Sequence, residues 1–227
     1  MMKGIRIVGL AILLIIFVVS TAAAQGLFGG KKDDKAKVDV EGLSKRSASL
    51  VVRVQTATAS FADGIIIVLK AVGKKEKAEK LQKSLDNMKE KKGDVNATKA
   101  CNGDLNNALA EMKDIDLASQ MNKEEAQAHL GDSILKIGVG VILDGSAVKD
   151  ASILLQESQA ALKQVSWGAA GKVKEVINVA QFVTQEIPPQ ANSLQQYSDK
   201  LIKYAKTNSI TVPSPENIKK TATMAEN

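Results

Sequence analysis

Small and apolar residues between positions 43 and 71 recur at alternating steps of four and three, which is the spacing of one stripe along a long helix. The stripe consists of Leu43, Ser47, Leu50, Val54, Ala57, Phe61, Gly64, Val68 and Ala71. Because its members are mostly small or β-branched, a partner helix can approach closely. We therefore predict a helix over residues 39–72 that ends at Gly73.

The next two segments keep a helical period but differ in their outer faces. Residues 74–92 form the most charged stretch of the chain, with a narrow apolar stripe and Gly93 at its end. From Val95 onward the helical period continues across the pair Asn102–Gly103. The pattern predicts one amphipathic helix over 74–92 and a single second helix that runs to about Ser119.

A third segment, residues 122–165, has the pattern of a very long helix. Asn122 followed by Glu125 is typical of a helix N-terminus, and the steps of three and four continue from there. A glycine inside a helix costs ~1 kcal/mol relative to alanine. Four glycines lie within this segment, at Gly131, Gly138, Gly140 and Gly145. We therefore expect a break or a bend near Asp144–Gly145.

The last third of the chain predicts two moderate helices and a tail. The first helix, over 173–187, is expected to stop near its end because Pro188–Pro189 follows, and proline disfavours helix in the residue before it. A second helix covers 194–204. Residues 209–227 are expected to be an extended or frayed tail, with a short helix beginning at the Ser214–Pro215 cap.

Together these elements predict an all-α fold, an antiparallel bundle of about four long helices plus two or three shorter ones. The bundle domain is expected at residues 39–208, after a flexible leader at 25–38. The β-branched runs 64–69 and 138–143 would suit strands in isolation, but their flanks carry the helical period.

Residues 1–24 have the order of a secretory signal peptide: the basic residues Lys3 and Arg6, an apolar run over 7–19, and a small-residue site at 22–24. We predict cleavage before Gln25. The alternative is an uncleaved membrane anchor, although the run is shorter than the ~20 residues of a spanning helix. The short apolar core and the absence of cysteine pairs favour a bacterial, periplasmic protein.

The formal charge of +6 falls to +4 once Lys3 and Arg6 are removed. Lysine accounts for all but three of the 31 basic residues, and aromatic residues make up only 3% of the chain. Nucleic-acid recognition favours arginine and stacking aromatics, so we expect no nucleic-acid partner. A lysine-rich surface suits peripheral contact with an anionic membrane, or simply the solvated faces of helices.

The pattern contains no convincing catalytic, cofactor-binding or metal-binding residues, and we expect neither a cofactor nor enzyme activity. The single histidine, His129, shares its helix face with Glu125 and Asp132, which is ordinary helix-surface pairing. One histidine and one cysteine cannot build a zinc site, and Gly138–Val139–Gly140 lacks the third glycine of a dinucleotide loop. Cys101 lies on an apolar stripe and is interpreted as a small buried residue; an intermolecular disulfide is the alternative.

Two functional hypotheses remain. The first is an exported, non-catalytic helical bundle that binds a macromolecular partner or the cell envelope. The alternative is a membrane-active or lipid-binding protein that uses the apolar segments 64–73 and 134–143, both too short to span a bilayer. Trp167 stands beside Gly168 at a helix boundary, which suits either a core edge or an interfacial anchor.

Overall fold

The computed structural model describes residues 38–226, and every regular element in that range is a helix. The helices are α1 (Val40–Ala71), α2 (Lys75–Glu90), α3 (Val95–Met112), α4 (Leu117–Gln120), α5 (Lys123–Leu162), α6 (Trp167–Thr207) and α7 (Pro215–Glu226). The predicted all-α fold class is therefore confirmed. The predicted signal peptide and nearly all of the leader lie outside the described residues.

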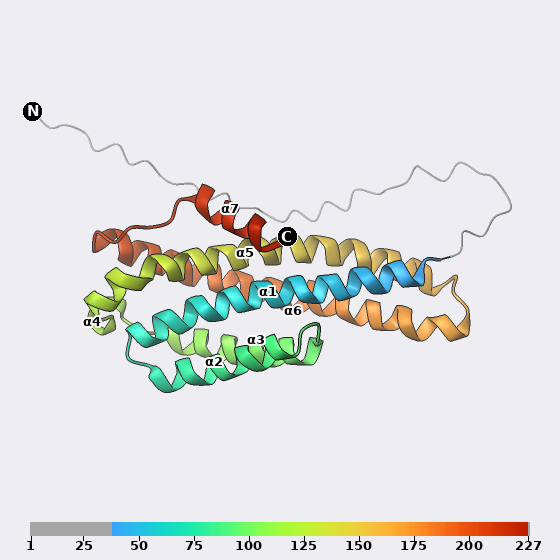
Figure 1. Cartoon of the computed structure of the whole chain (residues 1–227), viewed down its shortest axis with the longest axis horizontal. Coiled ribbons are helices and arrows are strands. Elements are labelled where there is room, and N and C mark those ends of the chain that lie inside the picture. The colour runs from blue at the N-terminus through green and yellow to red at the C-terminus, as the bar shows by residue number, and fades with distance from the viewer. Residues whose placement is uncertain (1–37, 227) are drawn as a thin grey trace, which may run out of the picture. The chain divides into compact units, whose positions relative to one another are not determined.

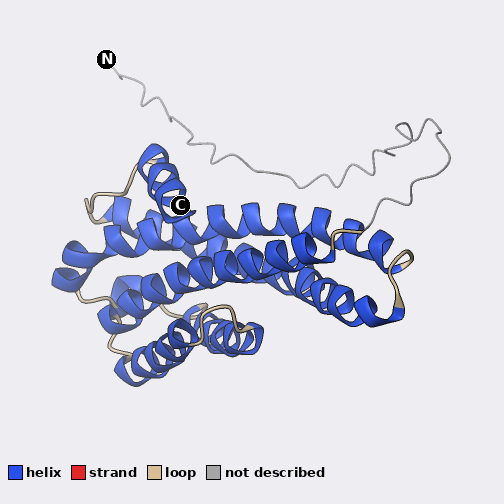
Figure 2. Ribbon diagram, turned by 45° about the vertical axis from the view of Figure 1, so that its right-hand side comes forward, coloured by secondary structure: helices blue, strands red, loops and turns tan. Residues whose placement is uncertain are grey.

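Three long helices, α1, α5 and α6, run along the whole length of the bundle (Figure 1). Helix α5 is antiparallel to the other two, so that Arg46 near the start of α1 pairs with Glu157 near the end of α5. Helices α2 and α3 form a hairpin that lies along one side of α1, and α7 lies over α5 (Figures 1 and 2).

The stripe predicted along α1 forms its buried face, since all nine residues of the stripe are buried. Gly64 marks the closest approach to α5. The Ser133 hydroxyl donates a hydrogen bond to the Gly64 carbonyl over 2.8 Å, and a Cβ added at Gly64 would lie 3.0 Å from the Ser133 carbonyl oxygen. The small residues of the seam therefore let two backbones approach, as the sequence predicts.

Several predicted helix ends are confirmed by their caps. The Asn122 side chain accepts hydrogen bonds from the backbone N–H groups of Glu124 and Glu125, over 2.9 and 3.2 Å. Gly73 and Gly93 follow α1 and α2 with φ angles of +76° and +83°, in the left-handed region that glycine adopts without strain.

Of the break or bend expected near Asp144–Gly145, the break is wrong, because α5 is one continuous helix of 40 residues. Glycines in its middle serve packing instead. A Cβ added at Gly140 would lie 2.6 Å from Cε1 of the Phe61 ring, and one at Gly138 would lie 2.8 Å from Cγ2 of Ile218. Close packing around these glycines offsets their low helix propensity.

The expected stop near Ile187 is also wrong, since α6 continues through Pro188–Pro189 to Thr207 as a helix of 41 residues. Proline lacks the N–H group that would bond the carbonyl four residues earlier, so the helix loses two backbone hydrogen bonds at this point. The buried stripe nevertheless keeps its phase on both sides, through Val183, Ile187, Gln190, Leu194, Tyr197 and Leu201. One continuous buried face therefore overrides the local signal to stop.

Two further boundaries differ from the predictions. Helix α3 ends at Met112 rather than near Ser119, and α4 begins separately under a cap from Asp116, whose carboxylate accepts the Ala118 N–H over 3.0 Å. The short C-terminal helix forms as α7, and it is packed where an extended or frayed tail over 209–227 was expected. Its Ala222 is fully buried in the core.

The core divides into two clusters along the bundle. One, which we call the wide end, contains buried residues from α1 to α7, with large side chains such as Phe61, Leu85, Met112 and Ile134. The other, the narrow end, draws its buried residues from α1, α5 and α6 alone: Leu43, Leu50, Val54, Ala147, Ala151, Leu154, Ala161, Val173, Val176, Phe182, Val183 and Ile187.

Candidate functional site

The residues weighed for catalysis lie on one exposed face of α5. Glu125, His129 and Asp132 are all exposed, and within residues 38–226 the His129 side chain makes no hydrogen bond or ion pair. The described part of the chain also contains no group of three or more His, Cys, Asp or Glu side chains arranged to hold a metal ion.

Cys101 is a fully buried, unpaired thiol in the wide-end core. Burial raises its pKa to about 11, because removing the group from water disfavours the charged thiolate. The interpretation of Cys101 as a small buried residue is confirmed. An intermolecular disulfide would first require the wide end to open.

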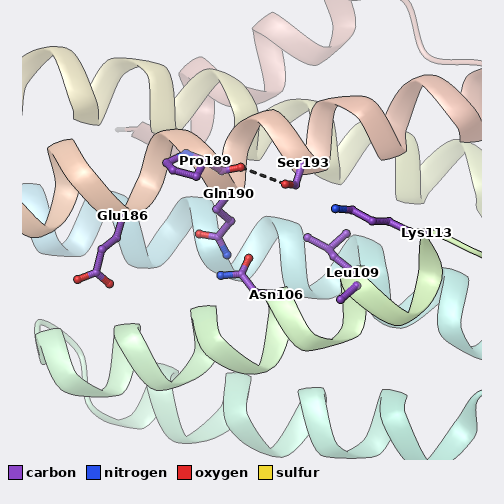
Figure 3. A pocket seen from close by; sticks show the side chains of 8 residues that line it. Asn106, Leu109, Lys113, Glu186, Pro189, Gln190 and Ser193 are labelled. Carbon is purple, nitrogen blue, oxygen red and sulfur yellow. Dashed lines mark hydrogen bonds between the residues drawn. The ribbon is translucent and has the colours of Figure 1, made fainter.

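A shallow groove between α3 and α6 has a volume of about 220 Å³. It is lined by Asn106, Leu109, Ala110, Lys113, Glu186, Pro189, Gln190 and Ser193. Figure 3 shows the Gln190 and Asn106 side chains pointing toward one another, while Glu186 and Lys113 lie at opposite ends of the groove. Its polar groups do not converge on one point, and its volume is below the ~300 Å³ typical of a ligand pocket.

Behind this groove lies a buried hydrogen-bond network. The Asn102 side-chain oxygen accepts bonds from the Thr58 hydroxyl, over 2.9 Å, and from the Gln190 amide nitrogen, over 3.3 Å. The Gln55 side chain bonds the turn between α2 and α3, where its oxygen accepts the Gly93 N–H over 2.8 Å. These polar residues hold the α2–α3 hairpin in register against α1 and α6, which is a structural role.

A second groove, between α1 and α5, contains both arginines of the described chain. Arg46 pairs with Glu157 and Arg53 with Asp150, and Glu226 of α7 lies 3.7 Å from the Arg53 Nε. Each guanidinium is thus already matched to a carboxylate within the chain. The arrangement ties α1 to α5 and α7 rather than presenting free positive charge to a ligand.

Asp144 is an isolated acid at the boundary between the two clusters, adjacent in α5 to Leu143 of the wide end and three residues before Ala147 of the narrow end. It is 2% exposed, and among residues 38–226 its Oδ1 finds no hydrogen-bond partner. Burial raises the pKa of this carboxyl well above its usual range.

The most exposed large apolar side chain is that of Trp167, at 94% exposure. It is the first residue of α6, at the tip of the α5–α6 hairpin, so of the two positions that the sequence leaves open the core edge is excluded. The preceding Ser166 makes no side-chain cap, and the first turn of α6 holds no acidic residue. A Cβ added at the neighbouring Gly168 would also contact nothing within 4 Å.

The surroundings of Trp167 are basic, and the chain enters the bundle at the same end. Lys163, the residue that follows α5, and Lys172 and Lys174 of α6 are all exposed, and Glu175 is the one exposed acid among them. Val38, the first described residue, packs against the narrow-end core, as does Val165 of the hairpin loop. We call Trp167 and these three lysines the tip surface.

The two apolar segments of the membrane hypothesis lie within the bundle. Nearly all of the apolar residues of 64–73 and 134–143 belong to the wide-end core or pack against it. Among the described helices, only α1 is long and apolar enough to cross a membrane by length and composition, and 61% of its most apolar window is buried in the fold. A core helix of a soluble bundle passes the same test, so α1 is weak evidence for a membrane span.

Comparison with known proteins adds no assignment: no protein-family description, curated protein or solved structure matches this chain significantly. What the tip surface can bind therefore follows from the exposure and charge of its own residues. The sequence signals that point to it are a lone tryptophan at a helix boundary, followed directly by Gly168, with the nearest lysines at 163 and 172. These signals leave core and surface positions open, because exposure is set by where α5 ends and α6 begins.

Proposed function

We propose that this protein is an exported, non-catalytic helical bundle that acts by binding a macromolecular partner or the cell envelope. The observation that carries the proposal is the 94% exposure of Trp167 in a chain with a single tryptophan. Tryptophan is enriched among the residues that dominate binding interfaces, and a fold that needed it for packing would bury it.

The burial of 64–73 and 134–143 supports this proposal over the membrane-active alternative. Releasing those segments would require the wide-end core to open, which would expose large side chains such as Phe61 and Leu69 to water. Binding through an already exposed surface needs no such rearrangement. The signal peptide pattern at residues 1–24 is the basis for proposing export.

Site-specific photo-crosslinking in intact cells tests the proposal. A photoreactive amino acid placed at Trp167 is expected to give a discrete adduct in the envelope fraction. The matched control places it at the exposed position Lys83 on the outer face of α2, where we expect no adduct. Loss of all adducts at 167, together with a soluble protein that retains residues 1–24, would contradict both the binding and the export parts.

A further inference from the structure

We propose that the tip surface docks onto an anionic lipid bilayer, with the Trp167 ring entering the headgroup region. This inference rests on the proposed function and names the envelope component. Trp167 has an apolar ring system and one N–H donor, a combination that favours the boundary between lipid tails and water. Because the ring is 94% exposed, it can enter that boundary without any change in the fold.

The charge around Trp167 fits a negatively charged surface. Lys163, Lys172 and Lys174 are exposed, and lysines near an anionic leaflet are attracted by its negative surface potential. Of the acidic residues at this end, Glu175 is exposed beside Lys174, whereas Asp39 and Glu41 have partners within the chain. Asp39 accepts the Gly42 N–H over 2.8 Å, and Glu41 pairs with Lys45 over 2.8 Å.

A lipid surface fits the tip better than a protein partner does. Protein interfaces are enriched in tryptophan but depleted in lysine, and their central aromatic residues are surrounded by other apolar side chains. Here the next residues along α6 are the small Gly168, Ala169, Ala170 and Gly171, and the exposed charged side chains nearby are those of Lys163, Lys172, Lys174 and Glu175. A single ring suits the boundary of the lipid tails, and the lysines around it suit the anionic headgroups.

The single tryptophan is its own probe in the test. The chain from residue 25 onward, which contains the whole described bundle, is mixed with vesicles of phosphatidylcholine alone or with phosphatidylglycerol added. With the anionic vesicles we expect a blue shift of the tryptophan emission and quenching by lipids brominated in the acyl chains. Both signals should weaken as salt is raised, because the attraction is screened.

Variants separate the ring from the charge. Trp167→Ser is expected to weaken co-sedimentation with anionic vesicles about tenfold, which corresponds to about 1.4 kcal/mol. The triple variant Lys163→Glu, Lys172→Glu, Lys174→Glu is expected to abolish the difference between the two vesicle types. Met224→Ser removes another exposed apolar side chain, 69% exposed on α7, and should bind like the parent chain.

An unchanged tryptophan emission with anionic vesicles overturns the inference, as does equal binding by Trp167→Ser and the parent chain. A protein adduct at position 167 without vesicle binding also overturns it but leaves the proposed function standing. If neither vesicle binding nor any envelope adduct is seen, both proposals fail.

Discussion

At the wide end, α2, α3, α4 and α7 pack around the three long helices, whereas the narrow-end core is built from α1, α5 and α6 alone. The large aromatic Phe61 is fully buried at the wide end, and the tryptophan of the narrow end is 94% exposed. Chains of this size gain stability mainly from buried apolar area. The wide end therefore carries most of the stability, and the narrow end is free to present a surface.

Between the two ends lies a layer of buried polar residues. Thr58, Asn102 and Gln190 bond one another there, while Asp144 has no partner for its Oδ1 among residues 38–226. A satisfied polar network specifies register, but an unpaired buried acid only costs stability. The boundary is thus both the alignment point of the helices and a weak point in the core.

The largest expected effect is at the wide end. Phe61→Ala should destabilise the bundle by about 3–5 kcal/mol, because it removes a fully buried ring and leaves a cavity against α5. Lys45→Ala is the matched control on the outer face of α1, and it should change stability by less than ~0.5 kcal/mol. Denaturant unfolding measures both. An unchanged midpoint for Phe61→Ala would mean that the wide end does not depend on this core.

The boundary layer predicts a pH effect through Asp144. Burial raises the pKa of its carboxyl in the folded state. Above pH ~4, the ordinary pKa of the group, the carboxyl is ionised in the unfolded chain but keeps its proton in the folded chain. Stability is therefore fully present below that pH and falls by about 1.4 kcal/mol per pH unit above it, until the folded-state pKa is passed.

The variant Asp144→Asn removes this ionisation at nearly constant side-chain volume. We expect Asn to be stabilising relative to Asp at pH 7 and to lose most of that advantage near pH 4, as measured by urea unfolding at both values. Glu90→Gln, which changes an exposed carboxylate at the end of α2, is the control and should show no such pH dependence. An advantage of Asn that is the same at both pH values would contradict a raised pKa.

Alanine substitutions at two glycines of α5 are expected to change stability by smaller amounts, and in opposite directions. Gly140→Ala should destabilise by about 1–3 kcal/mol, because three ring atoms of Phe61 lie within 2.6–2.9 Å of the new Cβ. Gly145→Ala meets nothing within 4 Å and should stabilise by about 0.5–1 kcal/mol, through the better helix propensity of alanine. Thermal unfolding compares the two. Equal effects would mean that helix propensity, and not packing, decides at these positions.

These glycines also illustrate what the sequence can and cannot predict. The period of small and apolar residues correctly predicts the buried face of α1, and local chemistry correctly predicts the caps at Asn122, Gly73 and Gly93. Predictions of helix breaks near Gly145 and at Pro188 are wrong, because both treat a local cost as decisive. In the folded chain the buried stripe continues in phase across each position, and its packing outweighs a cost of about 1–3 kcal/mol.

At the candidate site, too, the sequence does not predict how distant segments pack together. Sequence alone identifies Trp167 as a residue at a helix boundary but leaves its exposure open, since burial depends on how α5 and α6 meet. Similarly, Arg46 and Arg53 are seven residues apart, yet nothing in that spacing indicates that carboxylates 150 and 157 of a distant helix neutralise them. Such long-range pairings arise only from the antiparallel register of α1 and α5.

The smallest expected effect on stability is at the tip itself. Trp167→Ser should change the free energy of unfolding by less than ~0.5 kcal/mol, because the ring is 94% exposed and its removal opens no cavity. Most large aromatic residues behave in the opposite way, as Phe61 does. Guanidinium unfolding of the parent chain and the variant, followed by circular dichroism, measures the difference.

A loss of 2 kcal/mol or more, on the order of a buried aromatic, would place Trp167 in the core. The narrow end would then differ from the wide end only in the number of its helices, and the contrast between a stabilising end and a binding end would fail.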